Sequence, residues 1–163
     1  MHIYINNKFI SYGNYKAKCA IGKRGISIKK KEGDFITPKG TFKIREIFYR
    51  KDRVQNLKTR LKKTAIRKNM GWCDDPKSKK YNKLIYFPFK YSAEKLYRRE
   101  NIYDIILVLN FNMNPVKKNK GSAIFIHVAK KSFQPTQGCI ALNKFELIKL
   151  VKSIKINTVV KII

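Results

Sequence analysis

The chain has 163 residues, which is enough for one domain with a single well-filled hydrophobic core. Hydrophobic residues make up 44% of it and charged residues 29%, a balance that excludes a largely disordered chain. Because 38 basic residues face 10 acidic ones, the net charge is +28, and such an excess attracts polyanions such as nucleic acid or anionic envelope polymers.

Several protein classes do not fit the pattern. No apolar run approaches the ~20 residues of a membrane-spanning helix, so we expect no transmembrane segment. The N-terminal stretch alternates apolar and polar residues and lacks the apolar core of a secretory signal. Three cysteines are an odd number, which argues against a disulfide scaffold. The two histidines and three cysteines have no metal-ligand spacing, so we expect no metal and no cofactor.

The first predicted elements are short strands. Residues 2–6 and 8–12 flank an Asn-Asn pair, which predicts a β-hairpin with a two-residue turn. Residues 16–22 alternate in the same way, and after a segment rich in Gly and Pro the strand pattern resumes over 41–48.

Residues 50–68 differ in character, because nine of these nineteen residues are basic. Val54, Leu57 and Leu61 recur at intervals of three and four, which predicts a helix with one apolar face. We interpret the segment as a solvated helical insertion, with an anion-facing arm as the alternative.

The second half combines apolar strands with two short helices. Residues 92–101 are predicted to be a helix capped by Ser92, and Asn143 with Glu146 three positions later predicts the start of another. Further strands are predicted over 84–87, 103–112, 121–128, 139–142 and 157–163.

The count is about eight short strands and two or three helices, without the strand–helix alternation of a parallel sheet. This pattern predicts a mainly antiparallel β-sandwich or barrel with a few peripheral helices. No repeat or linker divides the chain, so we expect one domain over residues 1–163, and a monomer.

The candidate chemistry lies in residues 127–142, "HVAKKSFQPTQGCIAL". A cysteine becomes a nucleophile when an imidazole lies within hydrogen-bond reach, and the spacing of His127 and Cys139 allows a strand, a loop and a return. Gly138 permits a backbone conformation that turns its amide toward an oxyanion. A core thiol and a structural histidine are the alternative interpretation.

Three ordered motifs resemble the L,D-transpeptidase catalytic domain, the YkuD type. They are "GDFITPKGTF" with its Thr-Pro-x-Gly stretch at 37–40, "GSAIFIHV" with His127, and "PTQGCIAL" with Cys139. A compact subgroup also carries the "GWCDDP" loop found here at 71–76, and the Tyr-Asn and Tyr-Asp pairs. Two positions depart from the commoner form of the family, which has Gly instead of Val128 and Arg instead of Ala141.

The resemblance implies a two-step acyl transfer on peptidoglycan stem peptides. Cys139 attacks the amide between the third and fourth stem residues, a D-amino acid leaves, and an acceptor amine resolves the thioester. His127 acts as the base, oriented by the backbone carbonyl of Val128, and the Gly138 amide donates to the oxyanion. We expect the two side chains to titrate as a coupled pair, with a thiolate–imidazolium form across the neutral range.

The substrate-binding residues are expected near this pair. The set comprises Trp72, Asp74, Asp75, Arg99, Thr136 and Gln137, with Arg98 as a second candidate to bind a stem carboxylate. One Asp of the tryptophan loop is expected to hold a substrate ammonium, with a structural turn as the alternative. For the two arginines, the alternative is a solvated surface.

Two rival functions are considered. The same Cys and His would serve an L,D-carboxypeptidase or amidase with water as the acceptor. From another class, residues 50–68 would serve a basic nucleic-acid-binding module, but only eight of the basic residues are Arg and no nucleic-acid motif is present, so we expect no nucleic acid partner. The expected substrate places the protein in the bacterial cell envelope.

Overall fold

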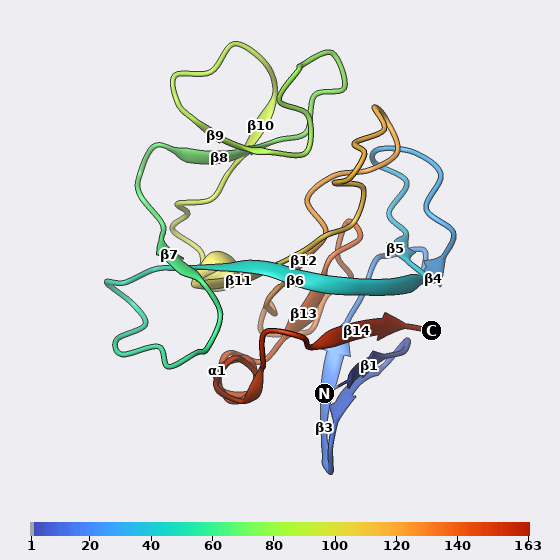
Figure 1. Ribbon diagram of the computed structural model, residues 1–163, viewed down its shortest axis with the longest axis vertical. Coiled ribbons are helices and arrows are strands. Elements are labelled where there is room, and N and C mark those ends of the chain that lie inside the picture. The colour runs from blue at the N-terminus through green and yellow to red at the C-terminus, as the bar shows by residue number, and fades with distance from the viewer. Residues whose placement is uncertain (1) are drawn as a thin grey trace.

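The structure, a computed structural model, describes residues 2–163 (Figure 1). Its largest sheet contains β1 (His2–Ile5), β2 (Phe9–Tyr12), β3 (Tyr15–Ala20), β6 (Gly40–Tyr49), β7 (Lys63–Ala65), β11 (Ile105–Leu109), β12 (Phe125–Val128), β13 (Ile140–Leu142) and β14 (Val159–Ile162). The other elements are β4 (Ile26–Ser27), β5 (Thr37–Pro38), β8 (Met70–Cys73), β9 (Leu84–Tyr86), β10 (Ala93–Lys95), the 3₁₀ helix η1 (Asn101–Tyr103) and α1 (Lys144–Ser153).

The large sheet closes on itself. Its strand order is β11-β12-β13-β3-β2-β1-β14-β6-β7, and β6 also pairs with β11, which completes a barrel. The pairs β1–β14, β12–β13 and β6–β7 are parallel and the other pairs of this sheet are antiparallel. The predicted mainly β, barrel-like fold is therefore confirmed. The predicted N-terminal hairpin is formed by β1 and β2, but its turn falls on Asn7 and Lys8 rather than on the Asn-Asn pair, because Ile5 pairs with Ile10 and the Asn6 amide donates to the Phe9 carbonyl at 3.0 Å.

Strand β11 shows why the barrel has hydrophobic residues on both of its faces. Ile105, Leu107 and Leu109 join one hydrophobic cluster, while Ile106 and Val108 between them join a second cluster. Successive side chains of a strand point to opposite faces, so burial on both faces produces the nearly continuous apolar run seen in the sequence.

The second cluster is covered by the small sheet β10-β8-β9, which lies at the top of Figure 1. Trp72 of β8 belongs to this cluster and is 4% exposed. Its ring meets the Phe125 ring of β12 edge to face at 5.3 Å, a favourable aromatic geometry. The small sheet is thereby packed directly on the strand that carries His127.

The helix predicted over residues 50–68 is wrong. The segment forms turns and the short strand β7, which pairs with β6. The apolar side chains Val54 and Leu57 are nevertheless buried. Asn56 has a φ of 52°, a left-handed conformation that interrupts a helix, and crowded like charges weaken helices further.

The helix predicted over residues 92–101 is also wrong. Ala93–Lys95 instead form β10, antiparallel to β8, and this long-range pairing overrides a local helical preference. The helix predicted after Asn143 is confirmed as α1, because the Asn143 side chain accepts from the Phe145 amide. Within residues 2–163 α1 is the one α-helix, where two or three helices were predicted. It is not long and apolar enough to cross a membrane.

Candidate active site

Two neighbouring strands bring His127 and Cys139 to one face. Strands β12 and β13 are parallel, with Ile126 opposite Ile140 and His127 opposite Ala141. Cys139 comes two residues before Ala141, so the alternation of side chains directs it to the face that His127 occupies. Ile126 and Ile140, the paired residues next to them, point the other way, into the main core.

The Thr-Pro-x-Gly stretch holds the loop of the nucleophile. The Thr37 hydroxyl, fully buried, donates to the Gly138 carbonyl at 2.8 Å and accepts from the Gly22 amide at 2.8 Å. Gly138 has a φ of 137°, and a Cβ on it would lie 2.9 Å from the Ile36 carbonyl oxygen. The position therefore requires glycine for both conformation and space.

The amide of Gly138 is already bonded within its own loop. It donates to the Thr136 hydroxyl at 3.1 Å, and that hydroxyl donates to the Cys139 carbonyl at 2.6 Å. We expected this amide to point at an oxyanion, and the structure directs it to a side chain instead. Thr136 thus shapes the turn that leads into the cysteine.

The Cys139 thiol donates to the Ala123 carbonyl at 3.1 Å and accepts from the Phe125 amide at 3.4 Å. Between the described side chains of Cys139 and His127 there is no direct hydrogen bond. Burial, followed by the negative charge of Glu94, raises the pKa of the thiol to about 12, against the opposing effects of the Phe125 amide and of Lys29.

The His127 ring is held by its neighbour in sequence. Nδ1 lies 2.9 Å from the Val128 carbonyl oxygen, which can only accept, so Nδ1 carries the proton and Nε2 is left with a lone pair. The ring packs edge to face on Tyr103 at 5.4 Å. Burial, reinforced by the positive charge of Arg98, lowers the pKa of His127 to about 4.

These pKa directions contradict the expected thiolate–imidazolium pair. Burial favours the neutral form of each group, so a neutral thiol and a neutral imidazole occupy the resting site at neutral pH. The imidazole is therefore available as a base, and the proton moves only when the thiol attacks.

Both side chains open onto one cavity of about 490 Å³. Its lining residues are Lys29, Glu32, Gly33, Asp74, Glu94, Arg98, Ile102, Tyr103, Ser122, Ala123, Ile124, His127, Lys130, Gln134, Pro135, Thr136, Gln137, Cys139 and Ala141. Of the residues expected to bind substrate, Asp74, Arg98, Thr136 and Gln137 are brought together here.

The other three expected substrate-binding residues lie elsewhere. Trp72 is a core residue whose indole donates to Asn82 Oδ1 at 3.0 Å. That same oxygen accepts from the Ala123 amide at 3.1 Å. Trp72 is thus connected through Asn82 to Ala123, whose carbonyl accepts a hydrogen bond from the Cys139 thiol. Asp75 accepts from the Lys77 amide at 2.9 Å, as a turn residue does. Arg99 lines a neighbouring open groove.

Two charged residues of the cavity, Glu94 and Lys29, were not expected from the sequence. Glu94 accepts from the Tyr103 hydroxyl at 2.7 Å and from Arg98 at 3.1 Å, which joins β10 to the residues beside His127. Glu94 was assigned to a helix, and no local signal indicates that it faces the cavity. Lys29 lies in a lysine run whose other members are exposed, so its burial could not be inferred.

The other two cysteines do not line this cavity. Cys19 and Cys73 are buried and unpaired, and burial raises the pKa of Cys19 to about 12. Within the part of the chain that the structure describes, no three His, Cys, Asp or Glu side chains are grouped to hold a metal ion.

Comparison with known families gives one match. The family described as YkuD, L,D-transpeptidase catalytic domain, matches residues 1–162. No curated protein matches the chain. The family match covers nearly the whole sequence, so the chain belongs to the L,D-transpeptidase catalytic domain family.

Proposed function

We propose that this protein is a cysteine acyltransferase that acts on peptidoglycan stem peptides. One observation carries the proposal: His127 of β12 and Cys139, the residue just before the neighbouring parallel strand β13, open onto the same cavity. Membership of a generally cysteine-dependent transpeptidase family supports the same chemistry.

The proposed reaction starts from neutral groups. The thiol gives up its hydrogen bond to the Ala123 carbonyl, and His127 Nε2 accepts the thiol proton as sulfur attacks the carbonyl carbon of the substrate amide. The imidazolium then protonates the leaving amine of the terminal D-amino acid, which leaves a thioester on Cys139. An acceptor amine attacks this thioester, gives a proton to His127, and the thiol is restored.

Charged residues of the cavity would orient the stem peptide. Ala141 stands where the commoner form of the family has an arginine, so we assign the stem carboxylate to Arg98, which reaches the cavity from the loop after β10. Asp74 would accept a substrate ammonium, because its Oδ1 atom is buried and has no hydrogen-bond partner among the described residues. Thr136 and Gln137 would line the path to the nucleophile.

The acceptor and the location are parts of the same proposal. Transfer to an amine gives a cross-link or an exchanged D-amino acid, whereas transfer to water gives a trimmed stem. A substrate in the cell wall implies an envelope location, where the net charge of +28 would favour contact with anionic polymers.

The test uses purified muropeptides and analyses products with and without an added D-amino acid. We expect release of the terminal D-amino acid, and incorporation of the added one. Release without incorporation would favour hydrolysis. Cys19→Ser is the matched control, since it removes a buried thiol outside the cavity and should keep the activity.

A further inference from the structure

The Lys29 side chain is buried, which is unusual for a lysine. Its side chain is 2% exposed and that of Asp34 is 3% exposed, and their charged atoms lie 2.5 Å apart. The neighbouring Lys30 and Lys31 are exposed. Taking a charged pair out of water is costly, so a buried pair is weak evidence for a purely stabilising role.

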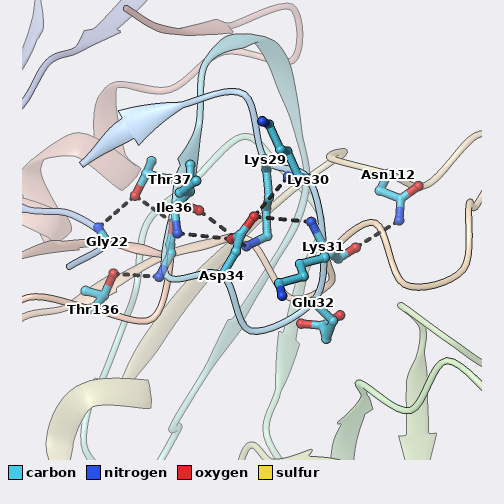
Figure 2. A network of polar contacts seen from close by, with 12 residues as sticks. Gly22, Lys29, Lys30, Lys31, Glu32, Asp34, Ile36, Thr37, Asn112 and Thr136 are labelled. Atoms are coloured by element: carbon cyan, nitrogen blue, oxygen red, sulfur yellow. Dashed lines mark hydrogen bonds and ion pairs between the residues drawn. The ribbon is translucent and has the colours of Figure 1, made fainter. Parts of the chain in front are cut away.

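Asp34 is the fixed half of the pair (Figure 2). Its carboxylate accepts from the backbone amides of Lys30, Lys31 and Ile36 in addition to the Lys29 ammonium. Burial acts to raise the pKa of Asp34, but these hydrogen bonds outweigh it and lower the pKa to about 2. The carboxylate therefore stays charged and holds the ammonium in place.

Gly121 makes room for the lysine, whereas a Cβ on Gly138 would only reach ordinary van der Waals distance from it. A Cβ on Gly121 would lie 2.4 Å from Lys29 Cε, and a Cβ on Gly138 would lie 3.6 Å from Lys29 Nζ. The ammonium also donates to the Ile36 carbonyl at 3.4 Å, the oxygen that packs against Gly138. The positive group therefore sits against the residue that precedes the nucleophile.

The ion pair is oriented with its positive end toward the site. Lys29 lines the cavity that contains Cys139, whereas Asp34 does not. The titratable and charged side chains around this cavity are Lys29, Glu32, Asp74, Glu94, Arg98, Tyr103, His127, Lys130 and Cys139. Among them Glu94 raises the pKa of Cys139 and Lys29 lowers it.

We propose that Lys29, held by Asp34 and packed between Gly121 and Gly138, supplies the positive potential that stabilises negative charge developing at Cys139. Lys29 acts on Cys139 through its charge, and Asp34 holds the Lys29 ammonium in position. The inference rests on the proposed function in one respect, the use of Cys139 as a nucleophile. A fixed, water-shielded cation costs no reorganisation during the reaction, which makes its effect larger than that of a surface lysine.

The test measures the reactivity of Cys139 itself, without any peptidoglycan substrate. Iodoacetamide alkylation of Cys139 is followed by mass spectrometry over a series from about pH 7 to about pH 10. Lys29→Met should slow alkylation by about threefold to tenfold at every pH, because a nearby opposite charge shifts a pKa by one unit or more and the more basic thiolate partly compensates. Lys30→Met, the exposed neighbour with the same charge change, should react at the native rate.

A variant of opposite sign separates charge from packing. Glu94→Gln removes a negative charge from the same cavity and should speed alkylation of Cys139. If Lys29→Met leaves Asp34 unpaired and does not fold, the double variant Lys29→Met with Asp34→Asn removes both charges at similar volume and should be slow. A folded Lys29 variant that reacts at the native rate across the pH series would overturn the proposal.

A substrate assay tests the proposed function separately from the reactivity of the thiol. Lys29→Met should also slow thioester formation from muropeptides. If the native protein alkylates normally but never forms a thioester, the proposed function fails and the inference about thiol reactivity still stands on the alkylation rates.

Discussion

Replacing Thr37 by valine tests how the Thr-Pro-x-Gly motif supports the nucleophile. Valine has nearly the shape of threonine but lacks the hydroxyl that bonds the Gly138 carbonyl and the Gly22 amide, both at 2.8 Å. Thr37 is fully buried, so water cannot replace the lost partner. Each unsatisfied buried group costs about 1–3 kcal/mol, so the two together are expected to cost about 2–6 kcal/mol of unfolding free energy.

The assay is urea unfolding followed by the fluorescence of Trp72, which is buried in the cluster beside β12. A loss of about 2–6 kcal/mol, against the ~5–15 kcal/mol that stabilises a typical domain, lowers the midpoint of unfolding clearly. Thr37→Ser is the matched control, because it keeps the hydroxyl and removes one methyl group, at about 1 kcal/mol. A valine variant as stable as the serine variant would refute the assigned hydrogen bonds. Activity should fall further than stability in the valine variant, since Gly138 loses its support.

Three further predictions concern the pair itself. His127→Gln should lower the rate of acylation by about a hundredfold or more, measured as lactam or stem-peptide adduct formation, and an unchanged rate would make His127 a core residue only. Because the pKa of folded His127 is lowered from 6.5 to about 4, protonation favours the unfolded state, so the stability present above pH 6.5 should decline as the pH falls to about 4. Urea titrations should show this decline in the native protein and less of it in His127→Gln, and equal slopes would contradict the shift. A carbapenem should form a covalent adduct on the peptide that contains Cys139, and an adduct on Cys73 would move the reactive site.

Features that depend on local pattern were predictable from the sequence. The apolar run of β11 indicated a strand, and Asn143 indicated the start of α1, because both depend on side chains close in sequence. The motifs around His127 and Cys139 were sufficient to propose one site, and the structure places both residues in one cavity.

Features that depend on long-range pairing were not predictable. Residues 93–95 form a strand because β8 offers a partner, and only that pairing turns Glu94 toward the cavity. Lys29 has the same sequence surroundings as its exposed neighbours, and its burial depends on Asp34 and on the space left by Gly121, which is distant in the sequence. The Gly138 amide was expected to donate to an oxyanion, but it donates to the hydroxyl of Thr136, two residues earlier in the chain.

The most direct test of the central claim is intact-protein mass spectrometry during turnover of a purified stem peptide. We predict a transient mass increase equal to the truncated stem, located on Cys139 by peptide mapping, together with release of the terminal D-amino acid. Cys139→Ser, which is close in shape to the native residue, should fold and show neither product. Release of the D-amino acid at the native rate by Cys139→Ser would contradict the account.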